Sequence, residues 1–183
     1  MDGSALKAPS APLLFPGLLG AGFATLQPRV RALHLREGVQ HLSGEVEVAR
    51  GTRWLSRLCA WATRLPPAGN APITVEIVAL PGHERWTRQI AGHAMPSRLW
   101  SRDGLLLEKL GPATFGFRLR AEDGAIAWRV ERVQVFGLRL PAKWFEDVSA
   151  RESECNGRYR FDVTAALPLA GLLVRYRGWL HVD

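Results

Sequence analysis

Glu152 is the residue whose type and position most clearly suggest chemistry. The pair Asn156-Gly157 suits a two-residue type I′ turn, because both central residues of that turn need positive φ. The register that follows places Phe161 opposite Glu152, and Tyr159 opposite Glu154, on one face of a hairpin. A carboxylate on an apolar face is a candidate acid, base or ligand-binding group.

Two interpretations of this carboxylate follow. In the first, Glu152 acts with Tyr159 or Tyr176 on a bound small molecule, so that the protein is an enzyme or an enzyme subunit. In the second, Glu152 and Glu154 lie near a strand end, reach solvent and pair with arginine. The second is favoured, because glutamate is seldom fully buried.

Aromatic residues are the next feature, since seven tryptophans are many for 183 residues. Their default role is core packing. A sheet of about eight to ten strands that curls, however, also has an interior with room for a ligand. Both interpretations stay open. The candidate ligand-binding residues are Trp86, Phe117, Trp128, Glu152, Tyr159, Phe161 and Tyr176.

Other kinds of catalysis receive little support. The five histidines lack metal-ligand spacing such as His-Glu-x-x-His, so no metal site is predicted. No Gly-x-Gly-x-x-Gly follows a predicted strand, so no dinucleotide or other cofactor is predicted. Ser56 and Ser101 lack the context of a nucleophile elbow.

The chain carries a net charge of +7, and its basic residues are nearly all arginine. Pairs such as Arg118/Arg120 and Arg175/Arg177 place both side chains on one strand face. A solvated outer face is favoured over nucleic-acid binding, because no nucleic-acid-binding motif accompanies the charge. Peripheral membrane contact stays open. No apolar run reaches the roughly 18–20 residues that span a bilayer, and a cytoplasmic location is favoured over secretion.

Apolar periodicity predicts two helical regions in the first half of the chain. Leu13–His34 repeats apolar residues at helical spacing, with Pro28 starting a new short helix. Thr52 can cap a second helix over Arg53–Leu65. Residues 1–11 are expected to be a disordered tail, and residues 12–183 a single globular domain.

From Ile73 onward the pattern is almost wholly β. Turn signals such as Asp103-Gly104 and Asp123-Gly124 recur, which predicts a meander of about eight to ten strands. The expected fold is therefore α+β: a strongly curved antiparallel sheet, a half-barrel or barrel, packed against the two helices.

The turns also fix registers. A two-residue loop at Asp123-Gly124 places Leu119 opposite Trp128. On the outer face of the last three strands, a ladder of Arg151, Asp162 and Arg177 is expected.

Several segments carry a further signal. They are Phe15-Pro16-x-Leu18-Leu19-Gly20, Val30-Arg31-Ala32-Leu33-His34, Leu65-Pro66-Pro67-Ala68-Gly69, Glu84-Arg85-Trp86-x-Arg88, Glu108-Lys109-Leu110-Gly111-Pro112, Gly157–Val163 and Leu167–Leu180. Together they resemble a bacterial family labelled domain of unknown function 4166, over roughly Leu13–Leu180. Members of that family occur alone or behind a reductase-like domain of the saccharopine-dehydrogenase or epimerase kind. The resemblance implies an accessory or binding module, with no catalytic residues to transfer.

The leading hypothesis is a non-enzymatic module that binds an apolar or amphipathic ligand, such as an acyl chain, between sheet and helices. It calls for an interior cavity of about 300 Å³ or more. The alternatives are the enzyme described above and an interaction domain that docks onto a reductase-like partner.

Overall fold

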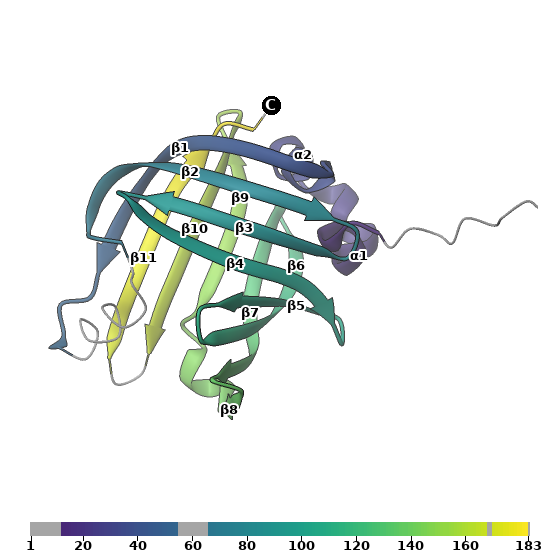
Figure 1. The fold of residues 1–183 in the computed structure, drawn as a ribbon. Coiled ribbons are helices and arrows are strands. Elements are labelled where there is room, and N and C mark those ends of the chain that lie inside the picture. The colour runs from purple at the N-terminus through teal and green to yellow at the C-terminus, as the bar shows by residue number, and fades with distance from the viewer. Residues whose placement is uncertain (1–11, 55–65, 168–169, 183) are drawn as a thin grey trace, which may run out of the picture.

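The protein is an antiparallel β-barrel with short helices at one end (Figure 1). The computed structural model describes residues 12–54, 66–167 and 170–182. The helical elements are α1 (Leu14–Leu19), the 3-10 helix η1 (Gly20–Thr25), α2 (Pro28–Leu35) and the 3-10 helix η2 (Ala142–Phe145). The strands are β1 (Gly38–Arg50), β2 (Gly69–Leu80), β3 (His83–Ile90), β4 (His93–Arg102), β5 (Leu105–Leu110), β6 (Ala113–Glu122), β7 (Ala125–Val135), β8 (Leu138–Leu140), β9 (Ser149–Cys155), β10 (Arg158–Leu167) and β11 (Gly171–Leu180).

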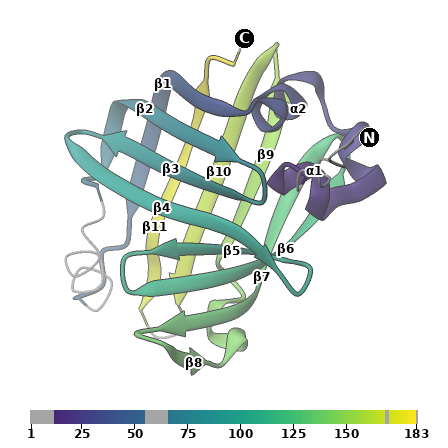
Figure 2. The ribbon, with the colours of Figure 1, turned by 45° about the vertical axis from the view of Figure 1, so that its right-hand side comes forward.

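One strand pair closes the barrel. Neighbouring strands follow the order β6-β5-β4-β3-β2-β1-β11-β10-β9-β7, and β6 also pairs with β7, so these ten strands of the described chain form a ring. The short β8 lies outside the ring, beside the end of β7 that β9 leaves unpaired. Figure 2 shows β2–β4 on one side of the interior and β9–β11 crossing behind them. The predicted curved antiparallel sheet is confirmed, in its closed form.

The predicted hairpin registers are confirmed. Asn156 and Gly157 both have positive φ, and Phe161 lies opposite Glu152. Likewise, Leu119 lies opposite Trp128 across β6 and β7. Because side chains alternate across a strand, these pairs determine which residues face the interior.

Two glycines allow β1 and β11 to approach each other closely. A Cβ on Gly178 would overlap the backbone oxygen of Glu45 and come within 2.6 Å of the Phe161 ring. A Cβ on Gly44 would overlap the backbone oxygen of Trp179. Only glycine fits at these two positions of the β1–β11 pair without a shift of the backbone.

The first predicted helical region is confirmed as α1, η1 and α2, which lie together at one end of the barrel (Figures 1 and 2). Their apolar side chains are deeply buried, with Phe15 and Val30 at 0% exposure. The Phe15 ring lies 6.2 Å from that of Trp86 on β3 and 5.7 Å from that of Trp128 on β7. Phe15 therefore joins two strands that are far apart in the sheet order.

Two predicted segments fall largely outside the described residues. The tail of residues 1–11 is one, and the helix predicted over Arg53–Leu65 is the other, apart from its first two residues. Among the described helices, none combines the length and the apolar character needed to cross a bilayer.

The outer-face ladder is confirmed in part. Asp162 pairs with Arg175 at 2.6 Å and with Arg177 at 3.7 Å. Arg151 lies opposite Asp162, as the register predicted. The ion pair expected there was wrong: in the described part of the chain none joins the two residues, and the Arg151 guanidinium lies 3.5 Å from the Glu122 carbonyl oxygen. The reason is that Arg175 donates to both carboxylate oxygens of Asp162.

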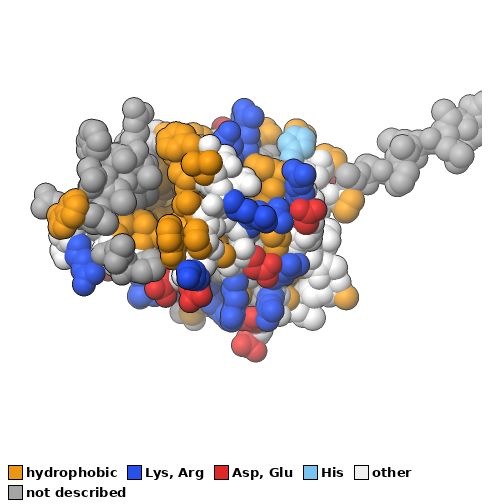
Figure 3. Space-filling model, turned by 90° about the horizontal axis from the view of Figure 1, so that it is seen from below, with side chains coloured by type: hydrophobic (Ala, Val, Ile, Leu, Met, Phe, Trp, Pro, Cys, Tyr) orange, Lys and Arg blue, Asp and Glu red, His pale blue; other side chains and the backbone are white. Residues whose placement is uncertain are grey.

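The β8 end of the barrel carries exposed hydrophobic side chains. Phe136, Leu138 and Trp144 are 82%, 72% and 47% exposed. Figure 3 views the molecule from this end and shows hydrophobic side chains gathered beside arginine and acidic ones.

Candidate functional site

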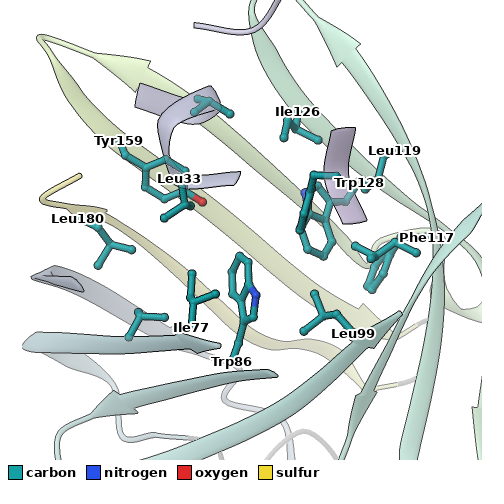
Figure 4. Close-up of a cluster of buried hydrophobic side chains, with 14 of the residues drawn as sticks. Leu33, Ile77, Trp86, Leu99, Phe117, Leu119, Ile126, Trp128, Tyr159 and Leu180 are labelled. Atoms are coloured by element: carbon teal, nitrogen blue, oxygen red, sulfur yellow. The ribbon is translucent and has the colours of Figure 1, made fainter. Parts of the chain in front are cut away.

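The barrel interior holds a cavity of about 90 Å³. Its walls come from the inward faces of strands on opposite sides of the ring, and they are mostly apolar. Figure 4 shows Trp86, Phe117, Trp128 and Tyr159 directed into this interior region. All of the predicted ligand-binding residues line it: Trp86, Phe117, Trp128, Glu152, Tyr159, Phe161 and Tyr176. Whether they bind a ligand stays a prediction.

The cavity is smaller than expected. A drug-sized ligand needs about 300 Å³ or more, whereas this space of about 90 Å³ holds several water molecules or one compact ligand. The large aromatic rings account for the difference, because they fill much of the interior. The tryptophans therefore pack the core, as their default role predicts, and the space that remains between them is smaller than the ligand hypothesis called for.

A buried histidine–carboxylate pair forms the polar end of the site. The Nε2 atom of His34, in the last turn of α2, lies 2.6 Å from the Oε2 atom of Glu152 on β9. The two side chains are only 1% and 5% exposed. Phe15 stacks on the His34 ring at 3.6 Å between centroids, which fixes the plane of the imidazole.

The favoured interpretation of Glu152, that it reaches solvent and pairs with arginine, was wrong. Its partner is His34, and the residue is 4% exposed, because α2 packs over the inward face of β9. Glu154 behaves differently. Its carboxylate accepts a hydrogen bond from the Arg29 backbone N–H in the first turn of α2, and its own N–H donates to the Gln27 side chain. Both glutamates thus attach α2 to β9.

A second buried carboxylate, Glu84, lies on β3. It accepts a hydrogen bond from the Trp86 indole N–H at 2.6 Å and is 3% exposed. Burial raises the pKa of Glu84, and the nearby charge of His34 and the Trp86 hydrogen bond oppose that rise. The interior therefore favours a neutral Glu84 more than water does.

Arg88 supplies a buried positive charge in the cavity wall. Its guanidinium pairs with Glu108 at 3.1 Å, donates to Ser97 and lies 4.9 Å from the centroid of the Trp86 ring. Burial lowers the pKa of Arg88, but the charge of Glu108 and the hydrogen bond with it outweigh burial, and the pKa is raised. Arg88 and Glu108 thus line the cavity as a neutralised pair.

Both tyrosines are held in the protonated form. Burial is the main cause that raises the pKa of Tyr159 well above its usual value, and the charge and hydrogen bond of Glu152 raise it further. Burial also raises the pKa of Tyr176. Their hydroxyl groups are therefore hydrogen-bond donors in this site, and neither tyrosine is suited to act as a base.

Sequence reasoning missed four polar residues of the interior: His34, Glu84, Arg88 and Glu108. A signal for two of them, Glu84 and Arg88, was available. Glu84, Trp86 and Arg88 share one face of β3 by their spacing, and a charged residue on an apolar strand face is itself a candidate. His34 had no such signal, because its carboxylate partner lies more than a hundred residues away.

The arrangement offers a carboxylate, two phenol donors and a neutralised arginine around an apolar space. Among the described residues, no group of three or more His, Cys, Asp or Glu side chains is placed to hold a metal ion. The chemistry of this donor set is hydrogen bonding and proton transfer.

Three comparisons place the chain among known proteins. Comparison with curated proteins finds no match. Among solved structures, the barrel is similar to the crystal structure of Rv2717c from M. tuberculosis, with 11% identity, 86% of this chain and 99% of that chain covered, and a TM-score of 0.44. The family model described as domain of unknown function (DUF4166) matches residues 26–180. The chain therefore belongs to the DUF4166 family.

Proposed function

We propose that this protein binds a compact apolar or amphipathic molecule inside its barrel. The observation that carries the proposal is the interior cavity of about 90 Å³, whose apolar walls also present Glu152, Tyr159, Arg88 and Tyr176. Ligand sites in proteins combine mainly apolar walls with a few placed polar groups, as this cavity does.

The polar groups give the ligand an orientation. The apolar part of the molecule would contact the rings of Trp86, Phe117 and Trp128. Its polar group would lie beside Glu152 and Tyr159, or beside the Arg88–Glu108 pair. An acyl-type ligand fits only as a short chain, because a long chain exceeds this volume.

A titration with small fragments tests the proposal. Ala150 lines the cavity, so Ala150→Leu fills part of it. Ala127 lies opposite Arg120 and Arg151, on the outer face of β7, so Ala127→Leu is the matched control. Ligand-observed NMR with compact fragments, among them cyclopentanone, should show binding to the native protein and to the control. Loss of binding is expected only in Ala150→Leu. Equal binding by all three proteins would place the fragment outside the barrel and contradict the proposal.

Catalysis in the same cavity is a second candidate function. It is favoured by the burial of Glu152 and by its short contact with His34, since a carboxylate oriented in a water-poor site is a good general base. Incubating the protein with extracts of small metabolites and following them by mass spectrometry tests this candidate. A substrate consumed by the native protein should be left intact by Glu152→Gln, while cyclopentanone still binds to that variant.

Docking onto a reductase-like partner is a third proposal, and it comes from the family resemblance alone. Affinity purification of the tagged protein from its own cells tests it. Recovery of a nucleotide-binding reductase would support it, and its repeated absence would count against it.

A further inference from the structure

Trp128 holds a buried hydrogen-bond donor, its indole N–H. The residue is 4% exposed and lines the cavity. Its indole Nε1–H has no hydrogen-bond acceptor among the described residues. Buried polar side-chain atoms nearly always have a partner, so this donor requires an explanation.

The ring of Trp128 is held in place by its neighbours. Phe117 packs edge-on against it at 5.3 Å between centroids, and Phe15 lies tilted against it at 5.7 Å. Figure 4 shows the indole nitrogen on the side of the ring away from Phe117. The N–H therefore cannot turn to bulk solvent without displacing two buried aromatic rings.

The other indole in the cavity wall makes the contrast. Trp86 donates its N–H to Glu84 at 2.6 Å, so the protein satisfies that donor internally. Leaving a buried donor unsatisfied destabilises the folded protein, and a ligand that supplies an acceptor removes this cost on binding. Of the two indole N–H groups, the one of Trp128 is without an acceptor in the described part of the chain.

We propose that Trp128 binds the acceptor oxygen of a neutral ligand, such as a ketone, aldehyde or ether. This inference rests on the proposed function and names the ligand class for that site. A neutral ligand is favoured over an anion because the carboxylate of Glu152 also lines the cavity. The charge of Arg88 is already paired with Glu108.

Two ring molecules of nearly equal shape test the inference. Cyclopentanone carries an acceptor oxygen, and methylenecyclopentane carries a carbon at the same place. Cyclopentanone should bind about 2- to 12-fold more tightly, which corresponds to the net effect of one hydrogen bond. In protein labelled with ¹⁵N-tryptophan, cyclopentanone should move the Trp128 Nε1–H resonance downfield and leave that of Trp86 in place.

The Trp128→Phe variant assigns the Trp128 Nε1–H resonance by its loss. This variant should also bind cyclopentanone and methylenecyclopentane equally. If this variant does not fold, replacing Trp128 with 3-benzothienylalanine keeps the ring shape and removes the N–H. Isobutyrate, a compact anion, should bind more weakly than cyclopentanone. If isobutyrate binds as tightly, the neutral class is overturned.

The outcomes separate this inference from the proposed function. If both ring molecules bind equally in the cavity and the Trp128 resonance stays in place, the inference is wrong while the proposed function stands. If neither binds and Ala150→Leu changes nothing, the proposed function falls, and the inference falls with it.

Discussion

The His34–Glu152 pair can be tested by replacing its members singly and together. His34→Phe keeps an aromatic ring against Phe15, and Glu152→Met keeps a side chain of similar length. Each single change leaves its partner buried without its hydrogen bond, since the two side chains are 1% and 5% exposed. Removing one member of a buried pair costs about 3–5 kcal/mol of the free energy of unfolding.

The structure also predicts an order between the two single variants. Glu152 contacts His34 at 2.6 Å and also accepts a hydrogen bond from Tyr159. Among the described residues, His34 hydrogen-bonds to the side chain of Glu152 alone. Glu152→Met therefore removes a hydrogen-bond partner from two buried groups, His34 and Tyr159, whereas His34→Phe removes one from Glu152 alone. Glu152→Met should be the more destabilising change.

The double variant is the decisive one. With both members replaced by apolar side chains, only Tyr159 loses a hydrogen-bond partner. The double variant should therefore lose less free energy of unfolding than the two single variants together, by about 2–3 kcal/mol. Urea unfolding at neutral pH, followed by circular dichroism, measures all four proteins. Additive costs would refute the reasoning, because they would mean that the two side chains do not interact in the folded protein.

Three further predictions follow from the same interior. Burial raises the pKa of Glu84 above the ordinary 4.5, so the native protein holds this proton more tightly than the unfolded chain does. The free energy of unfolding should therefore fall as the pH rises through the folded pKa of Glu84. In urea unfolding, the Glu84→Gln variant should lose less stability than the native protein between about pH 5 and pH 8. Gly178→Ala should lower the free energy of unfolding by about 1–3 kcal/mol through overlap with Glu45 and Phe161. The control is Gly17→Ala in helix α1, where a Cβ would meet only the Pro12 side chain, at 3.2 Å, and this change should cost less than Gly178→Ala. Equal effects would contradict the close approach of β1 and β11. Arg88→Met should lower the free energy of unfolding by about 3 kcal/mol, because it leaves Glu108 unpaired in the cavity wall. The control Arg118→Met breaks its pair with Glu131, which is about two-fifths exposed, and should lower it by less than about 1 kcal/mol. Similar melting temperatures for the two variants would argue against a buried Arg88 pair.

The sequence predicted those parts of the fold that depend on neighbouring residues, namely the two-residue turns and the alternation of side chains along each strand. Asn156-Gly157 and Asp123-Gly124 each specify a two-residue turn, and each turn fixes the pairing of its two strands. The alternation of side chains then assigns Trp128 and Phe161 to the interior. Such rules act between neighbours in the chain, so they identified the lining residues correctly.

Closure of the ring and the polar end of the site are not local. Sequence patterns do not specify that α2 packs over β9, and this packing converts Glu152 from a residue expected in solvent into a buried partner of His34. The size of the cavity likewise depends on how rings from opposite strands interlock. No pattern within one strand contains that information.

Crystals pressurised with xenon give the most direct test of the central claim, that a small space lies inside the closed barrel. Xenon enters apolar cavities of this kind. The structure predicts a xenon atom between Trp86, Trp128 and Tyr176, and its loss in Ala150→Leu. An interior in which these side chains meet, with no xenon between them, would contradict the account.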